Sequence, residues 1–180
     1  IKSADIIGSF FRTLIITVGS VLVIVLLTSM TAWYITRVKS KSNRIIYYLF
    51  LFSMIVPFQM VMYTMTSISV RLGLNSVLGI ILVYLGFGSG LSVFMFSGFI
   101  KSLPNEIEEA AMIDGCGPLK TFFYIVFPIL KPTAITVAIL NSMWIWNDFL
   151  LPYLLLGSNN KTLSVAIQLT MQGAYGAIDW

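Results

Sequence analysis

Histidine is absent from this 180-residue chain, and cysteine occurs only once. The missing histidine excludes a His-based catalytic triad and a histidine-ligated metal site, and a single thiol cannot form an internal disulfide. The chain also lacks a Gly-Lys pair, so it contains no phosphate-binding P-loop. Charged residues are scarce at 10%. The net charge of +4 therefore does not indicate a nucleic-acid-binding protein.

Apolar residues, by contrast, make up 58% of the chain, and the mean hydropathy is +0.92. A soluble domain of this length could not bury so much apolar surface, so the composition predicts an integral membrane protein. Four segments have the roughly 20 apolar residues needed to cross a bilayer core about 30 Å thick. They cover residues 11–36, 45–66, 77–100 and 133–156. Because no linker separates them, they predict one all-α transmembrane domain over residues 1–180.

Basic residues concentrate in the short segment between the first two apolar stretches, which holds Arg37, Lys39, Lys41 and Arg44. Such clusters stay in the cytoplasm, so this loop and the polar loop at residues 101–132 are predicted to be cytoplasmic. Both ends of the four-span segment then fall outside the cell. Because that topology is unusual and the chain does not begin with methionine, we expect a fragment of a longer protein. One further span would precede it and one would follow it.

Two of the apolar segments contain residues that shape helices. Pro57 lies midway along the second segment and is expected to kink it, because proline removes a backbone hydrogen bond. The third segment contains Gly86 and Gly90 at the GxxxG spacing that lets helices approach closely in lipid. This spacing indicates either ordinary helix packing or a tight contact at a pore or with a partner subunit.

Polar side chains within the membrane segments suggest a path for a substrate. Asn141, Trp144 and Asp148 share one face of the fourth segment, and Asp148 lies about 22 Å along it. This face could hold a sugar by hydrogen bonds and ring stacking, or Asp148 could brace or cap an irregular helix before Pro152. Gln59, beside the expected kink, could likewise line a polar path or merely follow a bend that shapes the bundle. The candidate path residues are Gln59, Asn141, Trp144, Asn147 and Asp148.

The polar loop between the third and fourth segments carries the most specific motif. It reads Glu109-Ala110-Ala111, Gly115 after three intervening residues, and Ile125-Val126-Phe127-Pro128 after nine more. This spacing resembles the EAA loop of the membrane subunits of binding-protein-dependent ABC importers, E-A-A-x3-G-x9-I-x-L-P. The one departure is Phe127, which stands where the family pattern has leucine.

Local physical chemistry also predicts a short helix in this loop. Pro104 suits a first helical turn, and glutamates at positions 106, 108 and 109 favour the N-terminal end of a helix dipole. Gly115 can end the helix in a left-handed conformation, and Pro118 can begin a second short helix. The alternative is an amphipathic helix lying on the inner leaflet, but anionic headgroups would repel its acidic residues.

The resemblance implies a permease of the type I ABC importer kind, whose members typically have six spans with both termini cytoplasmic. It also implies that the short helix docks in a cleft of an ATPase subunit, with ATP and magnesium bound by that partner and no cofactor bound by this chain. Glu109 is the implied polar anchor, Ala110 and Ala111 allow close approach, and Gly115 sets the turn. ATP-driven closure of two ATPases would then rock the spans between inward- and outward-facing states. The candidate coupling residues are Glu108, Glu109, Ala110, Ala111, Asp114, Gly115 and Pro128.

A second resemblance covers nearly the whole chain. Residues 144–152 and 162–166 and the closing Asp179-Trp180 look like carbohydrate permeases of the maltose and multiple-sugar type, in particular the G-type member of the permease pair. This implies a multi-pass subunit of a sugar importer in the bacterial inner membrane. Its implied partners are a second homologous permease and an extracytoplasmic binding protein resting near residues 162–173. Glycerol phosphate or another polyol is an alternative substrate, and an intramembrane enzyme or a channel is a remote alternative function.

Overall fold

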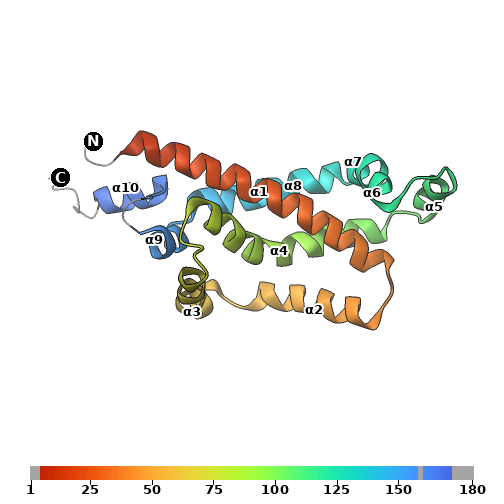
Figure 1. Ribbon diagram of the computed structural model, residues 1–180, viewed down its shortest axis with the longest axis horizontal. Helices are drawn as coiled ribbons and strands as arrows, with labels where there is room; N and C mark the ends of the chain where they lie inside the picture. Colours follow the sequence, from red (N-terminus) through yellow and green to blue (C-terminus); the bar gives the residue numbers. More distant parts are fainter. Residues whose placement is uncertain (1–4, 158–159, 172–180) are drawn as a thin grey trace. The chain divides into compact units, whose positions relative to one another are not determined.

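Every regular element in the described part of the chain is a helix, as the composition predicted. The computed structural model describes residues 5–157 and 160–171, so Asp179-Trp180 lies outside the described residues. The helices are α1 (Ile6–Arg37), α2 (Lys41–Ile55), α3 (Phe58–Arg71), α4 (Val77–Lys101), α5 (Glu106–Ile113), α6 (Pro118–Thr121), the π-helical turn η1 (Phe122–Val126), α7 (Phe127–Ile129), α8 (Lys131–Asn147), α9 (Leu150–Leu156) and α10 (Leu163–Met171). The α-helices are labelled in Figure 1, and η1 lies between α6 and α7.

Two of these helices are long and apolar enough to cross a bilayer without a break. They are α1, with 32 residues, and α4, with 25, and they coincide with the expected spans at residues 11–36 and 77–100. Two further spans are present if each of two bent helix pairs counts as one. The described residues therefore contain two to four candidate spans in an all-helical membrane bundle.

The segment expected as the second span is divided at Pro57. α2 ends at Ile55 and α3 begins at Phe58. Proline supplies no N–H to the helix ladder and disfavours helical conformation in the residue before it, so the break falls where the proline stands. The helix is interrupted where Pro57 predicted a kink, and residues 45–66 form two helices in place of one.

The segment expected as the fourth span is interrupted as well. α8 ends at Asn147 and α9 begins at Leu150, so residues 133–156 are not one continuous helix. At its other end, the stretch Pro118–Ile129 meets α8 at 76°. Pro132 stands in the first turn of α8, where its missing N–H breaks no intrahelical hydrogen bond.

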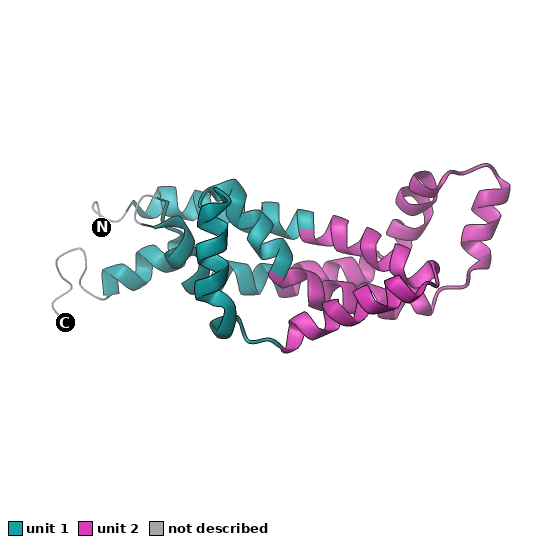
Figure 2. Cartoon of the chain, turned by 60° about the horizontal axis from the view of Figure 1, so that its bottom comes forward, with its two compact units in different colours: residues 1–23, 56–86, 141–180 teal, residues 24–55, 87–140 magenta. Residues whose placement is uncertain are grey.

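The chain forms two compact units (Figure 2). Unit 1 contains residues 1–23, 56–86 and 141–180, and unit 2 contains residues 24–55 and 87–140. α1, α4 and α8 each contribute residues to both units, so no linker in the sequence marks the division. Side chains at most 1% exposed include Ile16, Ile80, Tyr84 and Leu151 in unit 1, and Ile24, Phe96, Phe122 and Leu130 in unit 2.

Large apolar side chains also cover much of the outside. Ile7, Met60 and Leu78 are each 75–76% exposed, and many other leucines, isoleucines and phenylalanines are more than half exposed. Soluble monomers rarely expose contiguous apolar surface on this scale. These faces suit contact with lipid or with partner helices, in agreement with a membrane protein.

One glycine of the GxxxG pair lies at a close helix contact inside unit 2. A Cβ atom added to Gly90 of α4 would lie 2.8 Å from the backbone oxygen of Phe50 in α2. The same atom added to Gly86 would meet nothing within 4 Å. Gly90 therefore permits the approach of α2 to α4, whereas Gly86 is not needed for a contact of this kind.

We predict that Gly90→Ala destabilises the protein by about 1–3 kcal/mol, because the new methyl group forces α2 away from α4. Gly98→Ala is the matched control. It lies in the same helix with no atom within 4 Å of the added Cβ, and should be neutral or stabilising by about 0.5–1 kcal/mol. Thermal unfolding of the purified membrane protein measures both. Equal midpoints for the two variants would contradict the packing role of Gly90.

Candidate functional site

The polar loop contains the short helix that the motif predicted. α5 begins at Glu106 after Asn105, and three glutamates occupy its first turn, where they complement the helix dipole. It ends at Ile113, and Gly115 follows with φ +81°, the left-handed conformation that glycine adopts without strain. The Cys116 N–H donates to the Ala111 carbonyl at 2.9 Å, which satisfies one terminal carbonyl. The predicted role of Gly115 in ending the helix is present in the structure.

The inner side of α5 is fastened to the end of α1 by one carboxylate. Glu108 is only 6% exposed. Its Oε1 accepts from Arg37 Nε at 2.8 Å and lies 2.7 Å from Arg37 Nη2, while its Oε2 accepts from Trp33 Nε1 at 2.9 Å. Arg37 Nη2 also donates to the Leu103 carbonyl at 3.2 Å, just before α5. These contacts, all within unit 2, join residues more than 65 positions apart in sequence.

Aromatic packing continues the same anchor. The Trp33 ring lies 5.5 Å from the ring of Phe122, which is fully buried in η1, and Ala111 of α5 is buried as well. α6 begins at Pro118, as predicted, and leads directly into this π-helical turn. Both helical parts of the loop are thereby held against α1. The loop is therefore held in place by packing against α1 and is not a loose connection between α4 and α8.

The outer side of α5 is open. Glu109, Ala110, Met112 and Asp114 are exposed, and Ile113 is 85% exposed. Pro128, in α7, is also exposed.

The sequence grouped Glu108 and Ala111 with these residues as candidate docking contacts. The structure turns both into unit 2, so the exposed candidates are Glu109, Ala110, Asp114, Gly115 and Pro128.

A second cluster lies in unit 1 around the break between α8 and α9. Asp148 Oδ2 accepts from the Tyr84 hydroxyl of α4 at 3.0 Å, and its Oδ1 accepts from the Leu150 N–H at 3.0 Å. The Tyr84 ring also packs edge-on against Trp144, with centroids 5.5 Å apart. Of the two alternatives for Asp148, these contacts favour the structural one, in which it caps α9 and braces the break.

The other candidate path residues differ in their accessibility. Asn141 is buried, whereas Gln59 in α3 and Asn147 at the end of α8 are exposed. Asn147 donates its side-chain amide to the Met143 carbonyl of its own helix at 2.7 Å. Trp144 is 40% exposed and is joined to Asp148 through Tyr84.

Sequence reasoning missed three residues of these sites. From the sequence, Arg37 indicates only the membrane orientation, and nothing in the local pattern distinguishes Trp33 or Tyr84 from other aromatic residues. The available signal was an arginine at the end of an apolar span on the same predicted side as an acidic loop. Sequence spacing could not identify the partner, because Arg37 and Glu108 belong to different helices.

We predict that Arg37→Met lowers the stability of the protein by about 3 kcal/mol, because it leaves the Glu108 carboxylate buried without its partner. Glu108→Gln, which keeps an acceptor for Trp33, should cost less. The double variant should recover part of the loss, with a coupling energy of at least about 1 kcal/mol. Thermal unfolding of all four proteins completes the cycle.

The matched control for this cycle is Asp5→Asn, which removes one partner of the exposed ion pair between Asp5 and Arg12. The Asp5 side chain is 66% exposed, so the change should cost no more than about 1 kcal/mol. Strictly additive effects of Arg37→Met and Glu108→Gln would show that the two side chains are not energetically coupled.

The chain is similar to known proteins both in its sequence and in its fold. Residues 24–177 match the family described as "Binding-protein-dependent transport system inner membrane component". A solved structure, "Crystal structure of a bacterial ABC transporter involved in the import of the acidic polysaccharide alginate", superposes with a TM-score of 0.81. The match covers 96% of this chain and 60% of that one. At 20% identity it shows that the fold is shared.

Sequence relatives extend over most of the chain. The "Probable starch degradation products transport system permease protein AmyC" of Thermoanaerobacterium thermosulfurigenes is 44% identical over 88% of this chain. The "Multiple sugar-binding transport system permease protein MsmG" of Streptococcus mutans is 38% identical over 93%. The "Melibiose/raffinose/stachyose import permease protein MelC" of Bacillus subtilis is 37% identical over 97%.

The chain spans 58%, 62% and 63% of the lengths of these three relatives. The matched family consists of membrane transport components and not of enzymes. From the family match over residues 24–177 and the shared fold, the chain belongs to the family of binding-protein-dependent transport system inner membrane components.

Proposed function

We propose that this chain forms part of a permease subunit in an ATP-driven importer of sugars, with oligosaccharides as the substrate class. The observation that carries the substrate class is the agreement among relatives. The three described above are named for starch degradation products, for multiple sugars and for melibiose, raffinose and stachyose, and each match covers at least 88% of this chain. The proposed partners are two ATPase subunits, a second homologous permease and an extracytoplasmic solute-binding protein.

In this proposal α5 is the coupling helix. Its exposed side offers a charged group on Glu109, a small surface at Ala110 and an apolar side chain at Ile113, which is 85% exposed. A small residue lets a helix enter a narrow cleft, and a projecting apolar side chain can supply most of the contact energy once it is buried. ATP and magnesium are held by the partner ATPase.

The buried carboxylate explains how motion of α5 reaches the membrane helices. Because Glu108 binds Arg37 and Trp33 of α1, α5 cannot move without moving the end of α1 or breaking a buried ion pair. Closure of the ATPases therefore moves α1 together with the docked helix. This supports a rigid-body mechanism for switching between inward- and outward-facing states.

The proposed substrate path in unit 1 relies on the exposed members of the candidate set. Gln59, Trp144 and Asn147 expose surface that a sugar can contact through hydrogen bonds and ring stacking. Asp148 and the buried Asn141 serve instead to hold this part of unit 1 in place. Asp148 does so through its hydrogen bonds to Tyr84 and Leu150.

We predict that Glu109→Lys, Gly115→Val and Ile113→Asp each abolish sugar uptake while the subunit stays at its normal level in the membrane. The first reverses the charge of the docking side, the second forces a β-branched residue into a left-handed conformation, and the third puts a charge into an apolar contact. Arg71→Gln, an exposed charge on α3, is the control and should transport normally. Unchanged uptake in both Glu109→Lys and Gly115→Val would refute the coupling assignment.

The importer itself is tested by purifying the full-length protein from its native membrane under mild detergent and identifying its bound partners by mass spectrometry. We expect an ATPase and a second permease. We also expect the complex to hydrolyse ATP faster when the binding protein and an oligosaccharide are added. Stimulation by glycerol phosphate but not by oligosaccharides would overturn the substrate class alone. Recovery of the chain without an ATPase would overturn the importer.

A further inference from the structure

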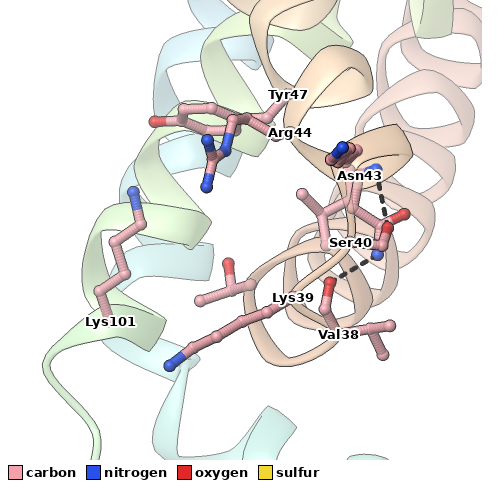
Figure 3. Close-up of a pocket in the computed structure, with 10 residues that line it drawn as sticks. Val38, Lys39, Ser40, Asn43, Arg44, Tyr47 and Lys101 are labelled. Carbon is pink, nitrogen blue, oxygen red and sulfur yellow. Dashed lines mark hydrogen bonds between the residues drawn. The ribbon is translucent and has the colours of Figure 1, made fainter.

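A cavity of about 330 Å³ lies in unit 2, where α1 ends, α2 begins and α4 ends (Figure 3). Its size is within the range of small-ligand sites. Ten residues line it, and none of them carries a carboxylate. The lining includes four cations, Lys39, Lys41, Arg44 and Lys101. Figure 3 shows the side chains of Lys39, Arg44 and Lys101 around the same space.

The walls of this cavity are ordered by hydrogen bonds of Asn43 that do not involve the four cations. The buried Asn43 donates its side-chain amide to the Val38 carbonyl at 2.7 Å and its backbone N–H to the Ser40 hydroxyl at 3.0 Å. The Lys101 ammonium lies 4.8 Å from the centre of the Tyr47 ring. Among the described residues, no ion pair includes any of the four cations that line the cavity.

The arrangement has an electrostatic cost that an anion removes. Like charges gathered around one cavity repel each other, and an anion inside it interacts favourably with all of them. The tendency of basic residues to stay in the cytoplasm explains why such residues occur in this loop. It does not explain why Lys101, from the end of a different helix, lines the same cavity.

The position of the cavity points to the chemical class of the anion. α1 and α4, the two unbroken span-length helices, end beside it at Arg37 and Lys101, so it lies at the level of the lipid headgroups. Just beyond it, α2 exposes an apolar side for acyl chains, with Ile45, Tyr48, Leu49 and Phe52 each 60–62% exposed. We propose that this cavity binds the phosphate of an anionic phospholipid of the cytoplasmic leaflet.

The site adjoins the coupling helix. A neighbouring cavity of about 500 Å³ shares Lys39 and Lys101 and is also lined by Arg37 and by Glu106 of α5. Glu106 is the one carboxylate in that second lining, and it does not line the four-cation cavity. The bound phosphate would therefore occupy the first cavity, where no carboxylate competes for the cations. Lipid binding at this cavity would require no transport activity and would not depend on the proposed sugar.

Native mass spectrometry of the full-length protein, in the complex in which it purifies, tests the proposal. The probes are phosphatidylglycerol and phosphatidylcholine, added to delipidated protein. The variant Lys39→Gln/Arg44→Gln removes two of the four cations that line the cavity and should weaken phosphatidylglycerol binding about tenfold. Phosphatidylcholine binding should not change. Arg44→Lys keeps the charge and should bind within about threefold of the original protein.

The matched control is Lys120→Gln/Lys131→Gln, which removes two exposed cations of residues 101–132 outside the cavity. It should bind phosphatidylglycerol within about twofold of the original protein. An equal loss in both double variants would mean general charge attraction and would overturn the site, as would no loss in Lys39→Gln/Arg44→Gln. Displacement of the lipid by millimolar inorganic phosphate would assign the cavity to a soluble phosphate and overturn the lipid assignment.

Discussion

The arrangement of unit 2 depends on one buried carboxylate. Glu108 could not be buried as an ion without compensation, because removing a charge from water costs several kcal/mol. Arg37 supplies the opposite charge and places two of its nitrogen atoms beside the carboxylate, and Trp33 donates its ring N–H to it. The pair therefore fixes α5 against α1 and leaves the opposite side of α5 free. A helix of only eight residues is marginal by itself, so this anchor is also what makes α5 a defined shape.

Interruptions in the apolar segments have identifiable backbone causes. Pro57 separates α2 from α3 because it cannot donate to the helix ladder. At the other break, Asp148 accepts the Leu150 N–H with one carboxylate oxygen in place of a backbone carbonyl, and its other oxygen accepts from the Tyr84 hydroxyl. Away from water each unpaired backbone group would be costly, so a break within a membrane segment needs such a substitute. A polar residue at a break in a membrane segment can therefore be required by the fold itself, whether or not it contacts a substrate.

Much of the fold could be predicted from local sequence. The apolar run lengths located α1 and α4 to within a few residues, and Gly115 and Pro118 marked the end of α5 and the start of α6. The sequence predicts a kink at Pro57 but not a complete break into two helices, because whether the helix stays continuous depends on what its two halves pack against. For the same reason, the sequence allows both a structural and a substrate-binding role for Asp148.

Composition, run length and residue spacing are local properties of the chain, so they are enough to specify a helical membrane protein with a motif-bearing loop. Which glutamate of that loop faces inward depends on contacts between helices that are distant in sequence. Glu108 and Glu109 are adjacent acidic residues, and the choice between them rests on Arg37 and Trp33, which lie 71 and 75 positions from Glu108. Local sequence likewise does not show that Lys101 lines the four-cation cavity, because that cavity is formed by helices that meet only in the folded protein.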